Sequence, residues 1–476
     1  MKMTSFKTVP VKVVGQSYEH RSEAFSVQKT MNLIPQAELT GAAGSSLTTW
    51  PGCTQFASLS GTNRGMTVFA NELYKVNGNT LYKIASDGTA TSLGVIAGTN
   101  RCIFANDGTN LIITTGATGY QLSGGVLTVI TDSDFQNANS VTYQNQQMLF
   151  DGNGGKFQVA DVGNPDSIQS NNFATAESSP DNTVRVFAFR ERVYIFGEGS
   201  IEGSVETWYN SGTGNPPWAR VNGGTMNVGL EAIHSVAATD DYCYFLGDDR
   251  RVYRFSSHQP QNVTSLAISH QFDLIGDMAD AVASIYRIEG QSFYVLTSPS
   301  GNKTFAFNEQ SSAWFNLSTG ADEDRYIGEE FTECYGKRLI SSKSDGGVYE
   351  LDLTTYTDNS VVKIQERILG PINGTVLGAD GERLLMSWFD IVMQTGVGLI
   401  TGQGESPQLM LSASFDGGKS WTNEDDVLIG RQGEGRIKAR WDHCESFYDC
   451  FIKIRCSDPV FLALFSGAIG LKPSGF

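Results

Sequence analysis

The sequence has 476 residues, of which 40% are hydrophobic and 11% aromatic, so it can bury a large core divided over two or three domains. Its 34 lysines and arginines stand against 51 aspartates and glutamates, and the net charge of −17 disfavours a surface built to grip nucleic acid or an anionic membrane. No apolar run approaches the span of a bilayer, and no hydrophobic segment follows the first residues. The sequence therefore predicts a soluble protein made without a signal peptide.

Residues 1–60 are predicted to form an extended N-terminal arm. Strand patterns are few between Ser17 and Ala43, and Trp50-Pro51-Gly52 is typical of a turn into the next region. The arm carries isolated apolar residues that need cover, namely Leu33, Leu39, Leu47 and Trp50. We expect the arm to lie across another surface, either of its own chain or of a neighbouring one.

Residues 61–356 repeat a pattern of short strands. One copy runs from Met66 to Ile84 as apolar runs separated by polar turns. Such runs, rich in Val, Ile, Tyr and Phe, predict strands, and links such as Asn77-Gly78 and Asp345-Gly346 predict hairpins. Three or four strands per unit, recurring about every 35–50 residues, are typical of propeller blades. The sequence predicts an all-β fold with a β-propeller of six or seven blades.

Residues 357–476 are predicted to form a further β domain. A polar stretch, Thr354 to Ser360, is expected to be a linker, and strands of a different spacing follow it. Alternating apolar and polar residues with Gly, Pro and Asp between them favour a β-sandwich or a barrel-like domain. This domain need not be closed by its own residues, because the N-terminal arm could supply a strand.

One motif of known structural chemistry lies in this last region. Ser414, Asp416, Gly418 and Trp421 match the Asp box, Ser-x-Asp-x-Gly-x-x-Trp, which is known from sialidases. In that pattern the Ser and Asp side chains hold a hairpin turn, the Gly has a positive φ and the Trp packs beneath. We interpret it as a structural turn, because a sialidase would also need converging arginines and a tyrosine nucleophile.

The sequence predicts no enzyme, no cofactor and no metal site. The seven cysteines form no Cys-x-x-Cys pair, and Cys444, Cys450 and Cys456 would lie about 20 Å apart along one strand, so buried thiols are expected unless a turn intervenes. Asp151 to Gly155 resembles a calcium loop, but Val162 stands where a bidentate Glu is needed, which favours a hairpin turn. Acidic runs are expected to be solvated faces, namely Asp322–Asp324, Glu329–Glu330 and Glu424–Asp426.

Four passages, taken in order, resemble the packaged-DNA stabilisation proteins of short-tailed bacteriophages, which are tail hub or nozzle proteins. The first is Asn32–Pro35 with Trp50–Gly52, and the second is Phe196–Tyr209. The third and fourth are Val228–Ile233 with Tyr294–Leu317, and a C-terminal pattern of Thr395–Gly398, Ser414–Trp421, Arg436, Arg440-Trp441, Ser457–Val460 and Gly467–Ile469. The resemblance covers nearly the whole chain, and the departures from it lie in the arm and the blade loops.

The resemblance implies a structural virion protein of the phage tail, assembled in the host cytoplasm. Such proteins form a homohexameric ring that extends the portal channel, retains packaged DNA, conducts it during ejection, and carries tail spikes or fibres and a needle. We expect the ring to be held chiefly by the arm and the C-terminal domain, which ends in the apolar strand Pro459–Phe465, with the propellers outside. An alternative is a carbohydrate-binding or glycoside-hydrolysing propeller, suggested by the Asp box and by Trp208, Trp218 and Trp314 as surface aromatics.

Overall fold

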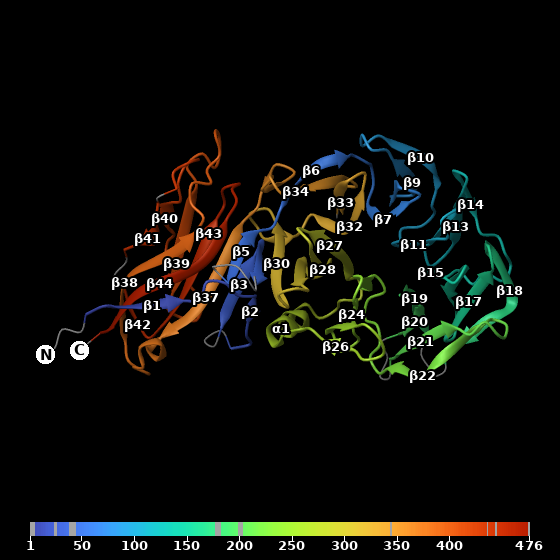
Figure 1. The fold of residues 1–476 in the computed structure, drawn as a ribbon, viewed down its shortest axis with the longest axis horizontal. Coiled ribbons are helices and arrows are strands. Elements are labelled where there is room, and N and C mark those ends of the chain that lie inside the picture. Colours follow the sequence, from blue (N-terminus) through green and yellow to red (C-terminus); the bar gives the residue numbers. More distant parts are fainter. Residues whose placement is uncertain are drawn as a thin grey trace.

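The computed structural model describes residues 5–22, 26–37, 44–176, 182–198, 203–342, 345–435, 437–442 and 445–474. The molecule is elongated, with a ring of small sheets at one end and a two-sheet sandwich at the other (Figure 1). Both termini lie at the sandwich end (Figure 1). Besides strands, the described residues contain helix α1 (Leu266–Ile275) and the 3-10 turn η1 (Gly374–Leu377). The predicted all-β fold is confirmed.

Five blades of the propeller are separate four-stranded antiparallel sheets. Blade one holds β7 (Asn63–Phe69), β8 (Glu72–Asn77), β9 (Thr80–Ile84) and β10 (Ala90–Val95). Blade two holds β11 (Ile103–Asn106), β12 (Asn110–Thr114), β13 (Gly119–Ser123) and β14 (Val126–Val129). Blade three holds β15 (Val141–Gln144), β16 (Gln147–Asp151), β17 (Lys156–Asp161) and β18 (Asn164–Thr175). Blade four holds β19 (Thr183–Phe189), β20 (Arg192–Gly197), β21 (Val205–Asn210) and β22 (Trp218–Met226). Blade five holds β23 (Ala237–Ala238), β24 (Cys243–Leu246), β25 (Val252–Phe255) and β26 (Gln261–Asn262).

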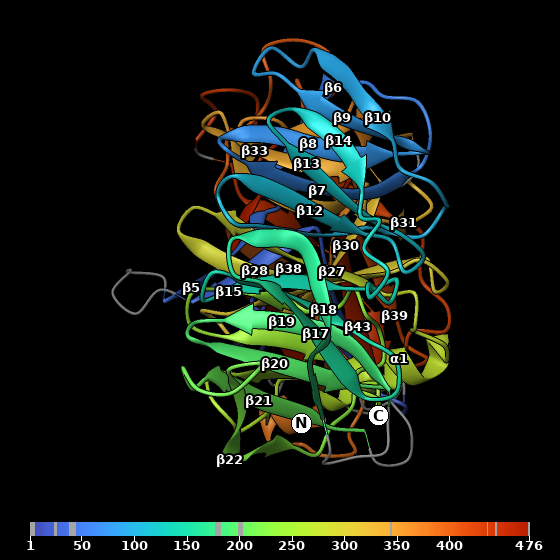
Figure 2. The same cartoon turned by 90° about the vertical axis from the view of Figure 1, so that its right-hand side faces the viewer.

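Two further blades belong to larger sheets, which brings the propeller to seven blades. Blade six holds β27 (Val282–Ile288), β28 (Gln291–Ser298), β29 (Lys303–Asn308) and β30 (Ala313–Thr319), with β31 (Asp324–Arg325) beside it. Blade seven holds β32 (Gly328–Cys334), β33 (Lys337–Ser342) and β34 (Val348–Asp352), and its outer strand is β6 (Gly52–Ala57) from the beginning of the chain. The ring is therefore closed by antiparallel pairing of residues almost 300 positions apart, and the blades succeed one another around it (Figure 2).

The sandwich consists of two sheets, here called the outer and the inner sheet. The outer sheet contains β4 (Leu33–Ala37), β5 (Ser45–Thr49), β44 (Ala463–Pro473), β38 (Leu384–Met393) and β41 (Ala439–Trp441), with β1 (Lys7–Val11) on β44 and β42 (Glu445–Phe447) on β38. The inner sheet contains β3 (Val27–Met31), β37 (Gln365–Asn373), β43 (Asp449–Cys456), β39 (Gln408–Ser414) and β40 (Asp425–Leu428), with β2 (Tyr18–Glu19) on β3. The arm therefore supplies strands to both sheets, which confirms a sandwich built from the C-terminal region and the arm.

The inner sheet is continuous with blade six. Strand β3 pairs antiparallel with β37 through Lys29–Met31, and Met31 also pairs in parallel with Asn316 of β30. One sheet thus runs from the propeller into the sandwich through a strand of the arm. Because backbone hydrogen bonds cross the boundary, the two domains are held in one fixed orientation.

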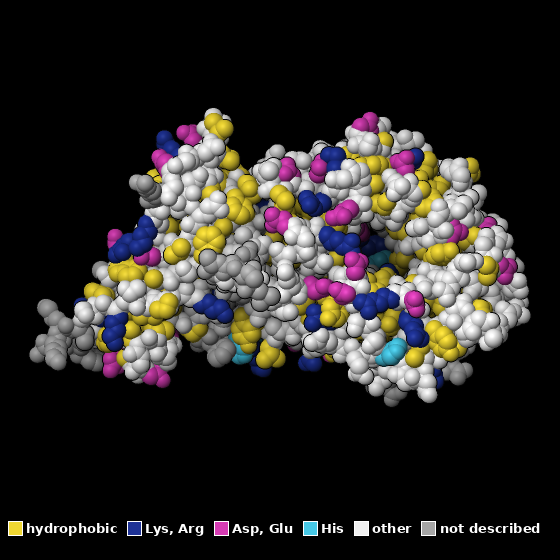
Figure 3. All heavy atoms as spheres, viewed as in Figure 1, with side chains coloured by type: hydrophobic (Ala, Val, Ile, Leu, Met, Phe, Trp, Pro, Cys, Tyr) yellow, Lys and Arg dark blue, Asp and Glu magenta, His cyan; other side chains and the backbone are white. Residues whose placement is uncertain are grey.

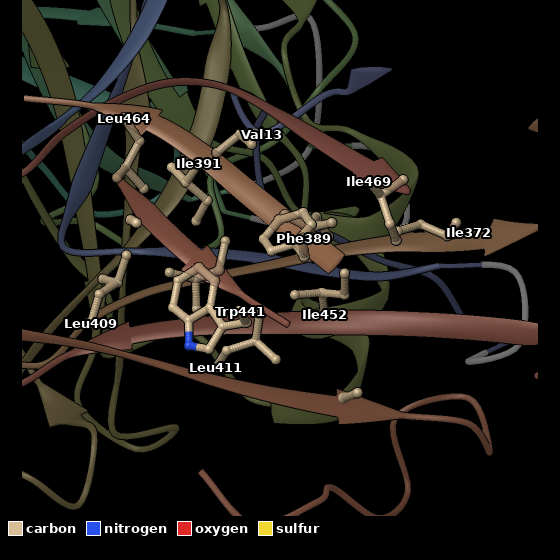
Figure 4. Close-up of a cluster of buried hydrophobic side chains, with 14 of the residues drawn as sticks. Val13, Ile372, Phe389, Ile391, Leu409, Leu411, Trp441, Ile452, Leu464 and Ile469 are labelled. Atoms are coloured by element: carbon tan, nitrogen blue, oxygen red, sulfur yellow. The ribbon is translucent and has the colours of Figure 1, made fainter. Parts of the chain in front are cut away.

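The sandwich core is formed by apolar side chains from the facing sides of both sheets. Phe389, Trp441 and Ile469 of the outer sheet pack against Leu411 and Ile452 of the inner sheet (Figure 4). These five side chains are almost completely buried. In the propeller, separate apolar clusters lie between neighbouring blades, as expected for small sheets that bury their faces against each other.

Two expectations about the arm and the linker are wrong. Leu33, Leu47 and Trp50 are almost completely buried inside their own chain, as are Val460, Leu462 and Leu464 near the C-terminus, so these residues leave no apolar surface for a ring contact. Leu39 lies outside the described residues. Thr354 to Ser360 is more than a polar linker, because β35 (Thr357–Asp358) pairs with β36 (Val361–Val362) and with Cys53 of β6. Strand partners distant in sequence supply the cover that local patterns could not reveal.

Candidate functional site

A hollow of about 450 Å³ opens at one mouth of the propeller channel. Figure 3 shows charged side chains gathered around this depression in the middle of the ring. The residues that line it come from several blades and are mostly polar: Asn100, Arg101, Thr115, Gly116, Asn139, Ile233, His234, Asp280, Pro299, Arg325 and Glu329. Binding pockets for organic ligands are mostly apolar and aromatic, and the wall of this hollow contains no Phe, Tyr or Trp.

The charges of this hollow are paired with one another. Arg101 contacts Glu329 at 2.6 Å and Glu330 at 2.7 Å, and Arg325 contacts Glu329 at 3.1 Å. The Asn63 amide donates to Glu329 at 3.0 Å and to Glu330 at 2.6 Å. Asn63 begins blade one, Arg101 precedes blade two, and both glutamates belong to blade seven. The network therefore joins the first two blades to the last one and supports the closure made by β6.

The hollow is poorly suited to acid–base catalysis. Glu329 is 2% exposed, and its oxygens already accept from two arginines and an amide. The Glu329 carboxylate is therefore not accessible as a general base for a substrate. Burial, assisted by Arg185 and Arg101, lowers the pKa of His234 to about 3. The imidazole is therefore neutral across the physiological range. The expectation that Glu329–Glu330 is a solvated acidic face is wrong for Glu329, because two arginines compensate its burial.

The junction between arm and sandwich is organised by Arg367, a buried residue of β37. Its Nε donates to the Val13 carbonyl at 2.8 Å, Nη1 donates to the Thr30 hydroxyl at 2.9 Å, and Nη2 donates to the Gln28 side chain at 2.8 Å. No carboxylate pairs with Arg367 among the described residues, and burial lowers its pKa to about 9. The guanidinium thus compensates its desolvation by satisfying polar groups of the folded arm.

Two further buried polar residues join the arm, the propeller and the sandwich. Asn32 has a φ of 55°, and its amide donates to the Ile364 carbonyl at 2.7 Å and to the Ser318 carbonyl at 3.1 Å. Lys363 donates to the carbonyls of Trp50 and Pro51, both at 2.9 Å, and lies 3.4 Å from Asp358. Sequence reasoning missed both cations, and the only local signal is that Lys363 and Arg367 stand between the apolar pairs Val361-Val362 and Ile368-Leu369.

The Asp box forms the hairpin that joins β39 to β40. Ser414 Oγ donates to Asp416 at 2.8 Å and accepts from the Gly418 amide at 2.8 Å, while Asp416 accepts from the Ser420 amide at 2.9 Å. These hydrogen bonds lower the pKa of Asp416 to about 2. Gly418 has a φ of 91°, which favours glycine. Trp421 is half-buried and lies under Lys453, whose Nζ is 4.6 Å from the ring centre.

Replacing Asp416 by alanine is expected to loosen this hairpin and to lower the melting temperature by a few degrees, because the Ser420 and Ser414 donors lose their acceptor. The stabilisation should be present above the ordinary carboxyl pKa and should be lost as the pH falls towards about 2. Melting curves of the variant and of the wild type between pH 7 and pH 2 would test this. Equal melting temperatures at pH 7 would contradict the structural role that we predict for the motif.

The proposed surface aromatics are not on the surface. Trp208, Trp218 and Trp314 are 8%, 5% and 1% exposed, because each packs between or within blades. The carbohydrate alternative therefore loses the aromatic platforms on which it depended.

The other candidate groups serve the fold or form no site. Asp151 to Gly155 forms the turn between β16 and β17, and Asp151 accepts from the Ser140 amide and hydroxyl. Cys450 and Cys456 are buried free thiols, whereas Cys444 and Arg436 lie outside the described residues. Within the described ranges, no group of three or more His, Cys, Asp or Glu side chains is placed to hold a metal ion, and no helix is long and apolar enough to cross a membrane.

Comparisons with known proteins agree with this architecture. The β-propeller model of bacteriophage P22 Gp10 matches residues 7–356, and the β-sandwich model of the same protein matches residues 372–471. The chain is 24% identical over 450 residues to the tail hub protein gp10 of Salmonella phage P22, with 86% of this chain and 87% of that protein covered.

Solved structures with low similarity include WD40 propellers. The Doa1 domain has a TM-score of 0.43 at 11% identity and covers 64% of this chain and 97% of its own. The Neurospora crassa Pan2 domain has a TM-score of 0.41 at 10% identity and covers 63% of this chain and 95% of its own. The two family matches account for both domains of the chain in the same order, and the protein therefore belongs to the bacteriophage P22 Gp10 family of tail hub proteins.

Proposed function

We propose that this protein is the structural tail hub of a short-tailed phage. Six copies form a ring below the portal or its adaptor, extend the portal channel, retain the packaged DNA and conduct it during ejection. Tail spikes or fibres and a needle attach to this ring. The observation that carries the proposal is the agreement of both domains, over 86% of the chain, with the tail hub protein of phage P22.

The physical properties of the chain support a passive conduit. A net charge of −17 opposes tight binding of phosphate, so duplex DNA can pass without the salt-dependent grip that a basic lining would create. The shared sheet of blade six and the sandwich supports a rigid connector, since backbone pairing fixes the two domains relative to each other. The glutamates of the channel mouth are engaged in ion pairs within the chain, which is consistent with a role in closing the propeller rather than in catalysis.

The proposal is tested by producing phage particles that lack this protein and supplying it from a plasmid. Particles without it should package DNA but lose it, whereas the supplied protein should restore nuclease-protected genomes and a six-fold ring beneath the portal in electron micrographs. Supplying the Asp416→Ala variant is a suitable control, because we expect only a small loss of stability from it. If particles without the protein retained their genomes and a complete tail, the proposal would be wrong.

A further inference from the structure

The outer sheet reverses the charge balance of the chain. Among the described residues, its strands and the positions directly adjoining them contain six lysines and arginines against three acids: Lys7, Lys12, Arg383, Lys438, Arg440 and Lys472, with Asp390, Asp442 and Glu445. Asp442 accepts from the Arg440 Nε at 2.8 Å. Over the whole sequence, acids outnumber bases 51 to 34. Strands β1, β38 and β41 of this sheet lie at the end of the molecule remote from the propeller (Figure 1). This face is therefore a locally cationic surface on an acidic protein.

The centre of this face is a preformed aromatic and cationic cluster. The Trp388 indole packs on Gly470, where any Cβ would lie 2.4 Å from the indole nitrogen. The Arg440 guanidinium lies 4.7 Å and the Lys438 ammonium 5.8 Å from the centre of the Trp388 ring. Asp390, 5% exposed, pairs with Lys438 and lies 3.8 Å from the Arg440 Nε. Tryptophan and arginine held in fixed positions are the residues that most often dominate binding at protein interfaces.

Apolar groups extend the cluster on the same face. Val392, on the same strand as Trp388, is 56% exposed. Phe6 is 39% exposed and lies beneath Lys472, whose Nζ is 4.6 Å from its ring. A partner for this face should therefore combine acidic groups with exposed aliphatic side chains.

Helix α1 offers that combination on another side of the same molecule. Its inward face buries Ala267, Ile268 and Phe272 against the propeller. The outward side carries Leu266 and Leu274, each 74% exposed, together with the exposed Asp273 and, just beyond the helix, Asp277. Positions 266, 270, 273 and 274 lie at helical spacing and form a single stripe, and Asp277 follows directly after the C-cap residue Gly276.

The segment that carries the stripe contains no base of its own. Between residues 255 and 286 the chain has three aspartates and no lysine or arginine. Arg250, from the preceding segment, contacts Asp273 at 3.4 Å but leaves Asp277 to solvent. Two leucines left in water beside exposed carboxylates are unfavourable in an isolated molecule and are typical of a docking surface.

We propose that neighbouring copies of this protein join head to tail, with the outer-sheet face of one copy seated on the α1 stripe of the next. This inference rests on the proposed ring. The two surfaces are complementary in charge and both carry exposed apolar side chains, yet they lie on different sides of the molecule (Figure 1), so one copy cannot satisfy both itself. A contact between two different patches repeats around a rotation axis, as a closed ring requires. It replaces a contact through the apolar side chains of Leu33, Leu47 and Trp50 and of the strand Pro459–Phe465, because Leu33, Leu47, Trp50, Val460, Leu462 and Leu464 are buried within the chain.

Another copy fits the outer sheet better than duplex DNA does. Duplex binding relies on a dense row of cations along the phosphates. The outer sheet has six lysines and arginines spread over all its strands, and two of them, Lys438 and Arg440, face the Asp390 carboxylate. The exposed Val392 and Phe6 also have no counterpart on a phosphate backbone. The leucines of α1 give them an apolar partner.

Assembled tails provide a direct test. A carbodiimide joins an amine to a carboxylate only when the two are in contact, so we expect peptide links between Lys438 of one copy and Asp273 or Asp277 of the next, identified by mass spectrometry. Links from Lys438 to a different tail protein, or none at all in intact rings, would overturn the interface while leaving the hub assignment in place. Absence of the protein from tails would instead overturn the proposed function.

Charge reversal tests the energetics. Supplying Lys438→Glu/Arg440→Glu, or Asp273→Lys/Asp277→Lys, should lower the yield of DNA-containing particles about tenfold or more, and supplying both variants together should recover part of it. Lys83→Glu/Arg190→Glu carries the same charge change on propeller residues outside both patches and should assemble normally. Circular dichroism melting confirms that each variant folds. Two results would contradict the proposal. One is assembly of the outer-sheet variant at the level of this control, and the other is binding of the wild-type protein to duplex DNA at physiological salt.

Discussion

Replacing Trp50 by alanine is expected to lower the apparent free energy of unfolding by about 3–5 kcal/mol, one of the two largest effects of a single substitution that we predict. Trp50 is 0% exposed and lies between the arm, blade six and blade seven. Its ring centre is 5.3 Å from that of Phe293 and 5.8 Å from those of Tyr286 and Phe315. Removing the indole leaves a cavity that rigid sheets on three sides cannot collapse to fill.

The matched control for this substitution is Trp421→Ala. Trp421 is half-buried at the surface of the sandwich and contacts Lys453, so its loss should cost much less. Urea unfolding followed by far-ultraviolet circular dichroism measures both variants without depending on tryptophan fluorescence. Equal shifts of the two unfolding midpoints would show that Trp50 does not hold the junction together.

Replacing Arg367 by methionine is expected to release the arm and to lower the apparent free energy of unfolding by about 3 kcal/mol or more. The substitution keeps most of the aliphatic volume but leaves the Val13 carbonyl, the Gln28 side chain and the Thr30 hydroxyl without their buried donor. Each unsatisfied buried group costs about 1–3 kcal/mol. The arm should therefore become accessible to protease while the remaining blades keep their structure.

Arg21→Met is the control, since Arg21 is an exposed arginine of the same arm. Limited proteolysis followed by mass spectrometry should detect cleavage between residues 12 and 31 in the Arg367 variant and not in the Arg21 variant. Protection of this segment in both variants, with unchanged unfolding midpoints, would contradict the role assigned to Arg367.

The propeller was accessible from the sequence because its signals are local. The strand from Asn63 to Phe69 and its neighbours to Val95 alternate and turn within a few residues of one another, and the pairing that follows is between adjacent segments. The same holds for the Asp box, whose hydrogen bonds all lie between Ser414 and Ser420. Family membership could also be anticipated, because four passages resembled the family in the same order along the chain.

The strands of the arm could not be predicted from local sequence patterns. Residues 17–43 looked poor in strands, yet β3 forms there because it pairs with strands hundreds of residues away, as in the pairing of Lys29 with Ile368. Strand β4 pairs with the nearby β5, as in the pairing of Leu33 with Thr49. Sequence patterns could indicate that Trp50 and Leu33 needed cover, but not that the same chain provides it. The same limit applies to Trp208 and Trp314, whose burial depends on neighbouring blades.

The sequence by itself determined the class of fold, the repeat of hairpins and the acidic balance, since each is set by composition and by neighbours along the chain. Only the tertiary structure decided how the ring closes through β6, how Arg367 and Lys363 hold the arm, and which apolar groups remain exposed. The physical reason is that a strand edge or a buried cation is satisfied by whichever distant group the fold brings to it. For that reason Leu33, Leu47 and Trp50 of the arm are buried, whereas Leu266 and Leu274 of α1 and Val392 of the outer sheet stay exposed.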